Sequence, residues 1–137
     1  MARMGTDGKQ QMVLIHEQLS GDIIGAAMTV LNTLKPGLDE KLYENALVIE
    51  LKKRHRTVEQ QRCFPVHYDT QEIGTLMPDL IVDEQVIVDA KVVSTFDENH
   101  TAQMIGYLAI SKLELALLLN FKYAELQWKR IVKSQES

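Results

Sequence analysis

The sequence is poor in cysteine and in long apolar runs, and each shortage excludes a class of protein. Its 137 residues include a single cysteine, Cys63, so no disulfide can form within the chain. The longest unbroken apolar run, 115–119, is far shorter than the roughly 20 residues of a membrane-spanning helix. The first residues lack the apolar core of a signal peptide. These absences predict a cytoplasmic protein with no membrane contact.

Positive charge is also scarce for a protein that holds nucleic acid by bulk electrostatics. The chain has 15 Lys and Arg against 19 Asp and Glu, giving a net charge of -4 and a pI of about 5.5. A nucleic-acid-binding domain of that kind usually has a pI above ~9. The charge therefore disfavours strong non-specific DNA binding, although an acidic enzyme site that takes up metal is not excluded. The basic run 52–56 reads as a solvated helix end, with contact to a DNA backbone as the alternative.

The sequence has enough apolar material for one hydrophobic core. Hydrophobic residues make up 45% and charged residues 25%, both ordinary for a globular protein. The length also fits one domain. We expect a mobile N-terminal tail over 1–11, a single domain over 12–133 and a short C-terminal tail over 134–137.

Hydrophobic periodicity and turn residues predict alternating blocks of helix and strand. The predicted helices cover 13–34, 39–56 and 99–111, and the predicted strands cover 63–68, 73–77, 79–82, 86–93, 115–120 and 126–132. Asp39 is expected to cap the second helix by accepting a main-chain N–H, and Cys63 to be buried in its strand. The order predicts an α+β fold, a mixed sheet with helices packed on it.

The strands at 79–82 and 86–93 carry the most informative polar residues. Asp89 and Lys91 are two apart, so both lie on one face of their strand. A loop over 83–85 would place Asp79 opposite Asp89, where Cβ atoms are about 4.5–5.5 Å apart. A two-residue loop would instead put the two aspartates on opposite faces. In the first case, the carboxylates would share a proton or bind a divalent cation.

Such a set of residues suits phosphodiester hydrolysis. Carboxylates can hold Mg²⁺ or Mn²⁺, which polarises a phosphate and lowers the pKa of bound water. A neighbouring lysine, here Lys91, can orient the water or offset developing negative charge. Glu40, in the first turn of the second helix, is a further acid able to reach the site. Gln103 and Tyr107 are four apart and share a helix face that could cross the site entrance.

The same residues resemble a known family. Residues 37–43 read G-x-x-E-x-x-Y, with Gly37, Glu40 and Tyr43 at the fixed positions. This motif names the GxxExxY proteins, small bacterial and archaeal proteins assigned to the PD-(D/E)XK nuclease superfamily. The resemblance extends to Pro78-Asp79, to Asp89-Ala90-Lys91 and to Gln103-x-x-x-Tyr107, which is similar to the Q-x-x-x-Y element of RecB-type nucleases.

The resemblance implies a restriction-endonuclease-like core, with a mixed central sheet flanked by helices. It implies a Mg²⁺- or Mn²⁺-dependent nuclease that hydrolyses DNA. The implied catalytic residues are Glu40, Asp79, Asp89, Lys91, Gln103 and Tyr107, of which Glu40, Asp79 and Asp89 would bind the metal. Asp89 departs mildly from close relatives, where Glu is more common, and its shorter reach would alter the metal geometry.

Simpler interpretations stay open beside this one. Asp89 and Lys91 can form an ordinary ion pair at a strand end, and Glu40 is a favourable charge at a helix N-terminus. Tyr43 is expected in the core rather than in catalysis. The chain can also be a catalytically silent nuclease-fold module that binds nucleic acid or a protein partner. A homodimer formed through the apolar stripe of the first helix is a third hypothesis.

Overall fold

The computed structural model describes residues 15–133, so the tails expected over 1–11 and 134–137 lie outside the described residues. Its helices are α1 (Glu17–Leu34), α2 (Glu40–Lys53) and α3 (Glu98–Ser111). Its strands are β1 (Val58–Gln60), β2 (Phe64–Tyr68), β3 (Gln71–Leu76), β4 (Leu80–Val82), β5 (Val86–Lys91), β6 (Leu115–Asn120) and β7 (Gln127–Val132). No helix in this range is both long and apolar enough to span a membrane.

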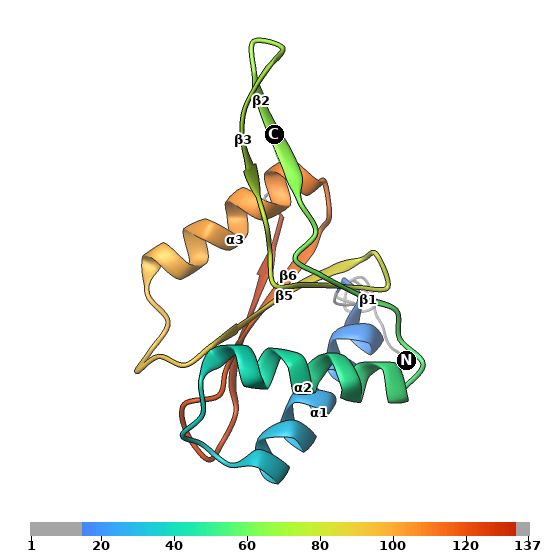
Figure 1. Ribbon diagram of the computed structural model, residues 1–137, viewed down its shortest axis with the longest axis vertical. Helices are drawn as coiled ribbons and strands as arrows, with labels where there is room; N and C mark the ends of the chain where they lie inside the picture. The colour runs from blue at the N-terminus through green and yellow to red at the C-terminus, as the bar shows by residue number, and fades with distance from the viewer. Residues whose placement is uncertain (1–14, 134–137) are drawn as a thin grey trace, which may run out of the picture.

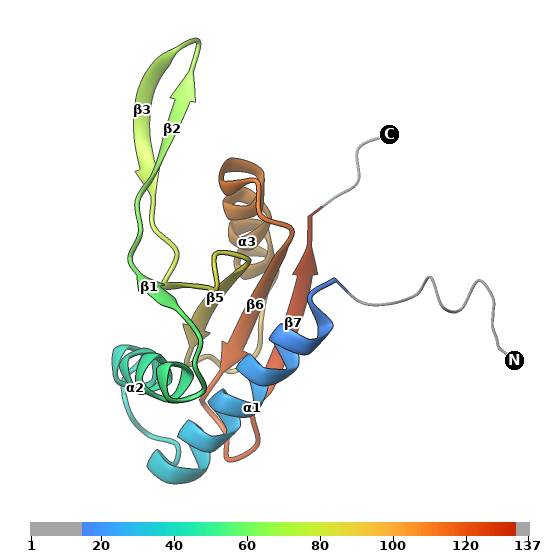
Figure 2. The same ribbon diagram turned by 90° about the vertical axis from the view of Figure 1, so that its right-hand side faces the viewer.

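Five strands form one mixed sheet in the order β1-β4-β5-β6-β7. β5 and β6 run parallel and are joined by a crossover through α3, whereas the other neighbouring pairs are antiparallel. Figures 1 and 2 show the helices on the two sides of this sheet. The mixed sheet flanked by helices confirms the predicted fold class, while the short edge strand β1 was missing from the prediction.

The two faces of the sheet build two separate apolar clusters. On one face, α1 and α2 pack against Val86, Val88 and Ala90 of β5. On the other face, α3 packs against a cluster that includes Ile87. Because side chains alternate along a strand, Asp89 and Lys91 lie on the α3 face with Ile87. Every residue of β6 is buried, as expected for a strand covered by helices on both faces.

The apolar stripe of α1, which motivated the homodimer hypothesis, is used inside the chain. Its buried residues are Leu19, Ser20, Ile23, Ala26, Ala27, Val30 and Leu31. They belong, apart from Ser20, to the cluster shared with α2 and the sheet. The stripe therefore needs no second copy of the chain to be covered.

Two arginines of the basic run are engaged in ion pairs rather than free for DNA. Arg54 Nη1 lies 2.9 Å from Asp22 Oδ1, and Arg56 Nε lies 2.9 Å from Asp22 Oδ2. Arg56 Nη1 also lies 2.9 Å from Asp83 Oδ2, in the turn between β4 and β5. The predicted solvated helix end therefore holds for Lys52, Lys53 and His55, which are exposed, whereas the half-buried Arg54 and Arg56 join α1, α2 and the sheet.

One local prediction is right only in part, and another is wrong. Asp39 occupies the N-cap of α2, but its side chain accepts no capping hydrogen bond. Cys63 is exposed, because β2 and β3 leave the main sheet and form a separate two-stranded sheet. This hairpin projects from the body of the molecule (Figures 1 and 2), so the residue at its base has no second layer to cover it.

Candidate functional site

The β4–β5 hairpin brings Asp79 and Asp89 face to face. Val82 pairs with Val86 and Leu80 with Val88, so 83–85 form the loop and Asp79 follows opposite Asp89. The two aspartates are also bonded reciprocally. Asp79 N donates to Asp89 Oδ1 at 2.9 Å, and Ala90 N donates to Asp79 Oδ2 at 3.0 Å. The register predicted from the three-residue loop is therefore confirmed, and each carboxylate is fixed by the main chain of the opposite strand.

Burial of these two acids disfavours their charged forms. Burial is the largest cause that raises the pKa of Asp79 to about 6, and the charge of Glu44 adds to it. Burial also raises the pKa of Asp89 to about 7, and the charge of Asp79 is the next cause in the same direction. Main-chain N–H donors oppose both shifts but do not cancel them. At neutral pH, the two carboxylates therefore lack enough nearby positive charge to stabilise their ionised forms.

Lys91 supplies one positive charge next to this pair. Its Nζ lies 3.7 Å from Asp89 Oδ2, and its side chain is only 15% exposed. The main chain around it is held by β6, since Phe121 N donates to the Lys91 carbonyl at 2.9 Å. Asn120, which pairs with Lys91 in the parallel register, is fully buried. The ammonium group is thus held at the edge of the acidic pair, largely shielded from water.

Gln103 and Tyr107 are brought together on α3 as predicted. Gln103 Nε2 donates to Tyr107 Oη at 3.1 Å. Tyr107 is buried in the α3-side cluster, and burial followed by the charges of Asp89 and Asp79 raises its pKa to about 12. The electrostatic coupling indicates that the hydroxyl lies near the acidic pair and stays protonated there. Gln103 is exposed, so its hydrogen bond connects the buried Tyr107 hydroxyl to a side chain in contact with solvent.

The helix acid that approaches the pair is Glu44 rather than Glu40. Glu40 is exposed at the start of α2, and its charge is the last of the causes acting on Asp79. Glu44, one turn later, is only 4% exposed, and its charge raises the pKa of both aspartates. The sequence did hold a signal, because Glu44 is three residues before Leu47 and so lies beside the apolar face of the helix.

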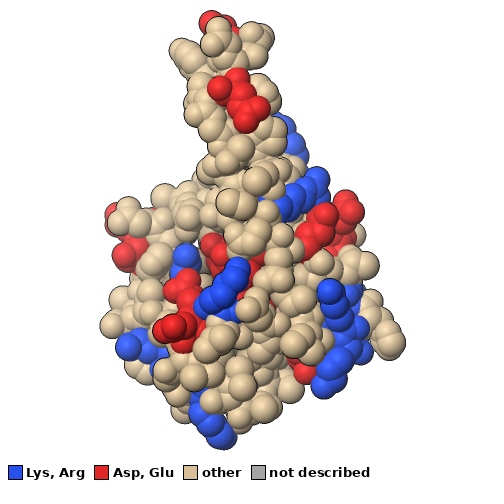
Figure 3. All heavy atoms as spheres, viewed as in Figure 1, with Lys and Arg blue, Asp and Glu red and all other residues tan. Residues whose placement is uncertain are grey.

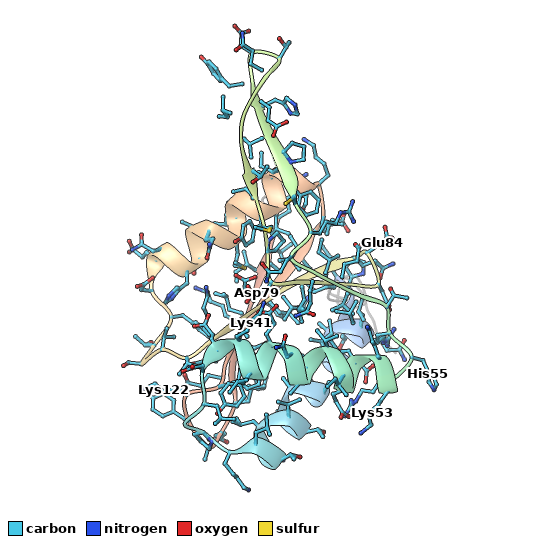
Figure 4. All side chains as sticks on the ribbon, viewed as in Figure 1. Lys41, Lys53, His55, Asp79, Glu84 and Lys122 are labelled. Carbon is cyan, nitrogen blue, oxygen red and sulfur yellow. The ribbon has the colours of Figure 1, made fainter. Side chains whose placement is uncertain are left out.

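Side chains from several elements fix the Glu44 carboxylate. Its Oε2 accepts hydrogen bonds from Lys41 Nζ at 3.1 Å, Gln60 Nε2 at 3.0 Å and Gln61 Nε2 at 3.2 Å. Gln61 N donates to the Asp79 carbonyl at 3.0 Å, which links this network to the start of β4. Figure 4 labels Lys41 and Asp79 in this central region, above α2 in that view.

The glycine and tyrosine of the G-x-x-E-x-x-Y segment are structural. Gly37 has a φ of 117°, which disfavours residues with a Cβ atom. Tyr43 is fully buried, as predicted, and stacks on Phe121 with ring centroids 4.8 Å apart. Its hydroxyl accepts a hydrogen bond from Leu38 N and donates to the Lys35 carbonyl. These contacts fix the α1–α2 connection and hence the position of α2 beside the acidic pair.

The two aspartates fit a hard divalent cation. Carboxylate oxygens are preferred ligands of Mg²⁺ and Mn²⁺, and these ions usually keep several waters or substrate oxygens. Within residues 15–133, however, no three His, Cys, Asp or Glu side chains gather closely enough to form a ready-made metal site. Glu40 is thus not gathered with Asp79 and Asp89, and a cation would be held by the two aspartates together with oxygens from outside the protein.

Comparisons with known proteins agree with this architecture. The solved structure described as the crystal structure of SSO0001 is similar, with 13% identity and a TM-score of 0.54 over 70% of this chain and 50% of that one. The chain thus spans about half the length of that protein, and the likeness shows the fold alone. No curated protein matches. A family model described as PD-(D/E)XK nuclease superfamily matches residues 17–131, and because this range covers most of the chain, the protein belongs to that superfamily.

Proposed function

We propose that the protein is a metal-dependent nuclease that hydrolyses phosphodiester bonds in DNA, and that it is of the GxxExxY type. The observation that carries the proposal is the reciprocal bonding of Asp79 and Asp89 with Lys91 Nζ 3.7 Å away. A buried pair of carboxylates is unfavourable without a compensating charge. Its presence beside a shielded lysine supports a functional site more than a structural one.

The residues have separate roles in this proposal. Asp79 and Asp89 would hold Mg²⁺ or Mn²⁺, which supplies Lewis acidity to a phosphate and lowers the pKa of a bound water. Lys91 donates hydrogen bonds to the attacking water or to a phosphate oxygen, so it orients the nucleophile and offsets developing charge. Tyr107 remains protonated, because its pKa is raised to about 12, so its hydroxyl serves as a hydrogen-bond donor in the site.

Glu44 and Gln103 position these groups. Glu44 connects α2 to the Gln60–Gln61 segment, which bonds the Asp79 carbonyl. Gln103 donates to the Tyr107 hydroxyl, which fixes the direction of the phenol. In Figure 3, acidic and basic atoms alternate in the middle of the face between the projecting hairpin and α2. A phosphate would approach the pair across this mixed surface.

The test is DNA cleavage by wild type and matched lysine variants. Single- and double-stranded DNA are incubated with each protein and Mn²⁺ or Mg²⁺, with chelator as the blank. We expect cleavage by wild type, a loss of at least about 100-fold in Lys91→Ala, and wild-type activity in Lys112→Ala, which changes an exposed lysine at the end of α3. Equal cleavage by wild type and Lys91→Ala, or none under any divalent condition, would reject catalysis by this site.

A silent binding module is the second candidate. The net charge of -4 and the lack of a three-acid metal site within 15–133 favour it. This candidate predicts nucleic-acid or protein binding that is unchanged in Asp89→Asn and independent of divalent ions. Binding that requires both Asp89 and a divalent ion, together with cleavage by wild type, would exclude it.

A further inference from the structure

The hairpin formed by β2 and β3 is a projecting arm (residues 63–77). Its turn consists of Asp69 and Thr70, whose φ values of 53° and 67° are those of a tight two-residue hairpin turn. At the base, Phe64 and Leu76 pack against the α3-side cluster. The outer half leaves the body of the molecule, as both ribbon views show (Figures 1 and 2).

The outer half of the arm exposes apolar side chains. Tyr68 is 74% exposed and Ile73 is 66% exposed, the two highest values among the exposed large apolar residues described. A two-stranded hairpin on its own is only marginally stable in water. The two strands of the arm pair from Phe64–Leu76 to Tyr68–Gln71, with a bulge after Val66, and leave these apolar side chains bare. An ordered hairpin with such a surface indicates that a partner covers it.

The charge of the arm indicates which kind of partner it fits. Residues 63–77 contain no lysine or arginine, and they contain two acids, Asp69 and Glu72. The acidic atoms show on the upper part of the arm in Figure 3. Phosphate groups repel these two acids, and no base of the arm offsets them, so this surface is unsuited to a nucleic-acid backbone. It suits an apolar protein surface bordered by positive charge.

Three grooves on the described surface differ in the charges that border them. The groove beside α3 is lined by Asp97 and Glu98 with Lys129, and the groove between α1 and the β6–β7 connection has Glu125 as its charged residue. Both would repel an acidic arm. The groove between α1 and α2, about 250 Å³ in volume, is instead lined by four apolar residues and two threonines, together with the oppositely charged Glu50 and Lys53.

The α1–α2 groove matches the arm in both polarity and charge. Its accessible apolar lining includes Leu34, Ala46 and Ile49, and Ile49 is 64% exposed. Lys52 and Lys53 follow Ile49 by three and four residues, so they border it on the helix surface. Glu50 is shared between Arg54 Nε at 3.3 Å and Lys53 Nζ at 3.4 Å, so one acid meets two bases here. Lys52 adds a further positive charge to this end of α2.

We propose that the protein forms a homodimer in which the arm of each copy lies in the α1–α2 groove of the other. Tyr68 and Ile73 cover the apolar lining, and Asp69 and Glu72 face Lys52 and Lys53. Two such contacts related by a two-fold axis close the assembly, as is usual for homodimers. This interface does not include the acidic pair, so the dimer proposal can be tested independently of the nuclease proposal.

The test combines charge reversal on each side with its compensation. Sedimentation velocity over the micromolar range should give a dimer for wild type. Asp69→Lys with Glu72→Lys, and separately Lys52→Glu with Lys53→Glu, should each raise the dimer dissociation constant by on the order of tenfold or more. The variant that carries all four changes should regain the dimer, because opposite charges meet again. Thermal unfolding of each variant confirms that it is folded.

Two controls make the result decisive. Glu84→Lys with Glu125→Lys changes the net charge as much as the arm reversal does, at residues outside the arm and the groove, and should leave the dimer intact. Tyr68→Ser with Ile73→Ser should dissociate it. The proposal is overturned if wild type is monomeric over the whole concentration range. It is also overturned if the variant with all four charge reversals fails to regain the dimer. A third outcome against the proposal is a monomeric wild type whose affinity for DNA is lowered by Tyr68→Ser with Ile73→Ser, since the arm would then contact nucleic acid.

Discussion

Asp79 and Asp89 oppose folding at neutral pH. Both lie in a place that disfavours charge, since burial raises their pKa values to about 6 and about 7. In the unfolded chain, an aspartate has its ordinary pKa of about 3.8. The folded protein therefore binds more protons than the unfolded chain between these values, and stability falls as pH rises through the folded pKa values.

The first prediction is that Asp89→Asn stabilises the metal-free protein at pH 8. The amide removes the buried negative charge while its Oδ1 still accepts from Asp79 N. We expect a gain on the order of 1–3 kcal/mol at pH 8 that shrinks toward zero near pH 4, where the wild-type carboxyls are protonated. Urea unfolding of both proteins in chelator, across this pH range, measures the difference. A variant that is no more stable than wild type at pH 8 would contradict the buried-charge argument.

The second prediction concerns divalent ions. If Asp79 and Asp89 hold the cation, Mn²⁺ should raise the thermal midpoint of wild type, with a stabilisation of about 2.7 kcal/mol at a free concentration 100 times the dissociation constant. Asp89→Asn should lose most of this response, because it loses a charged ligand. Asp39→Asn, an exposed aspartate without a side-chain capping bond, should respond like wild type. An unchanged response in Asp89→Asn would place the metal elsewhere.

At the scale of elements, Asn120 holds the segment that follows Lys91. It is fully buried, and its Nδ2 donates to the Val93 carbonyl at 2.8 Å while its Oδ1 accepts from Val93 N at 3.1 Å. Oδ1 also accepts from Lys122 N at 3.2 Å. The Asn120 amide thus replaces strand pairing where β5 ends. It fixes the main chain at Val93, two residues after Lys91, the proposed catalytic lysine.

The third prediction is that Asn120→Ala costs about 2–4 kcal/mol in the free energy of unfolding. The change leaves main-chain groups of Val93 without these partners in a part-buried place, and each such loss costs about 1–3 kcal/mol. Asn32→Ala, at an exposed position of α1, is the matched control and should change stability by less than about 0.5 kcal/mol. Chemical denaturation measures both. Equal effects of the two substitutions would show that the Asn120 bonds contribute little.

At the scale of the whole molecule, Asp22 ties the helical layer to the sheet. Its carboxylate bonds Arg54 and Arg56, and Arg56 continues to Asp83 in the β4–β5 turn. Asp83 also accepts from Thr57 N at 2.8 Å, just before β1. Burial opposes ionisation of Asp22, but Arg56 and Arg54 outweigh it and lower its pKa.

The fourth prediction is that Asp22→Ala lowers the free energy of unfolding by about 1–2 kcal/mol at pH 7. The pKa of Asp22 is lowered from 3.8, so its contribution is present above that value and is lost as pH falls below it. The difference between wild type and variant should therefore vanish in strong acid. Asp39→Asn again serves as the control. A difference that persists unchanged at acid pH would indicate lost packing rather than lost ion pairs.

The sequence by itself determined the fold class and the core of the candidate site. β-Branched and apolar runs specified the strands around 86–91 and 115–120, because these strands are buried on both faces and local composition reports burial. The sequence predicted that a three-residue loop over 83–85 places Asp79 opposite Asp89, with a two-residue loop as the alternative, and the pairing of Val82 with Val86 decides for the former. These relations involve residues close in the chain, so patterns of a few residues were enough to suggest them.

Only the tertiary structure decided the rest, because it depends on contacts between distant segments. Arg54 meets Asp22 across 32 positions and Asn120 meets Val93 across 27, and neither pairing has a local signature. The burial of Glu44, the exposure of Cys63 and the separation of the β2–β3 arm also depend on which surfaces lie opposite each segment. Periodicity records which side of an element is apolar, whereas the partner of each polar side chain is set by how the elements pack.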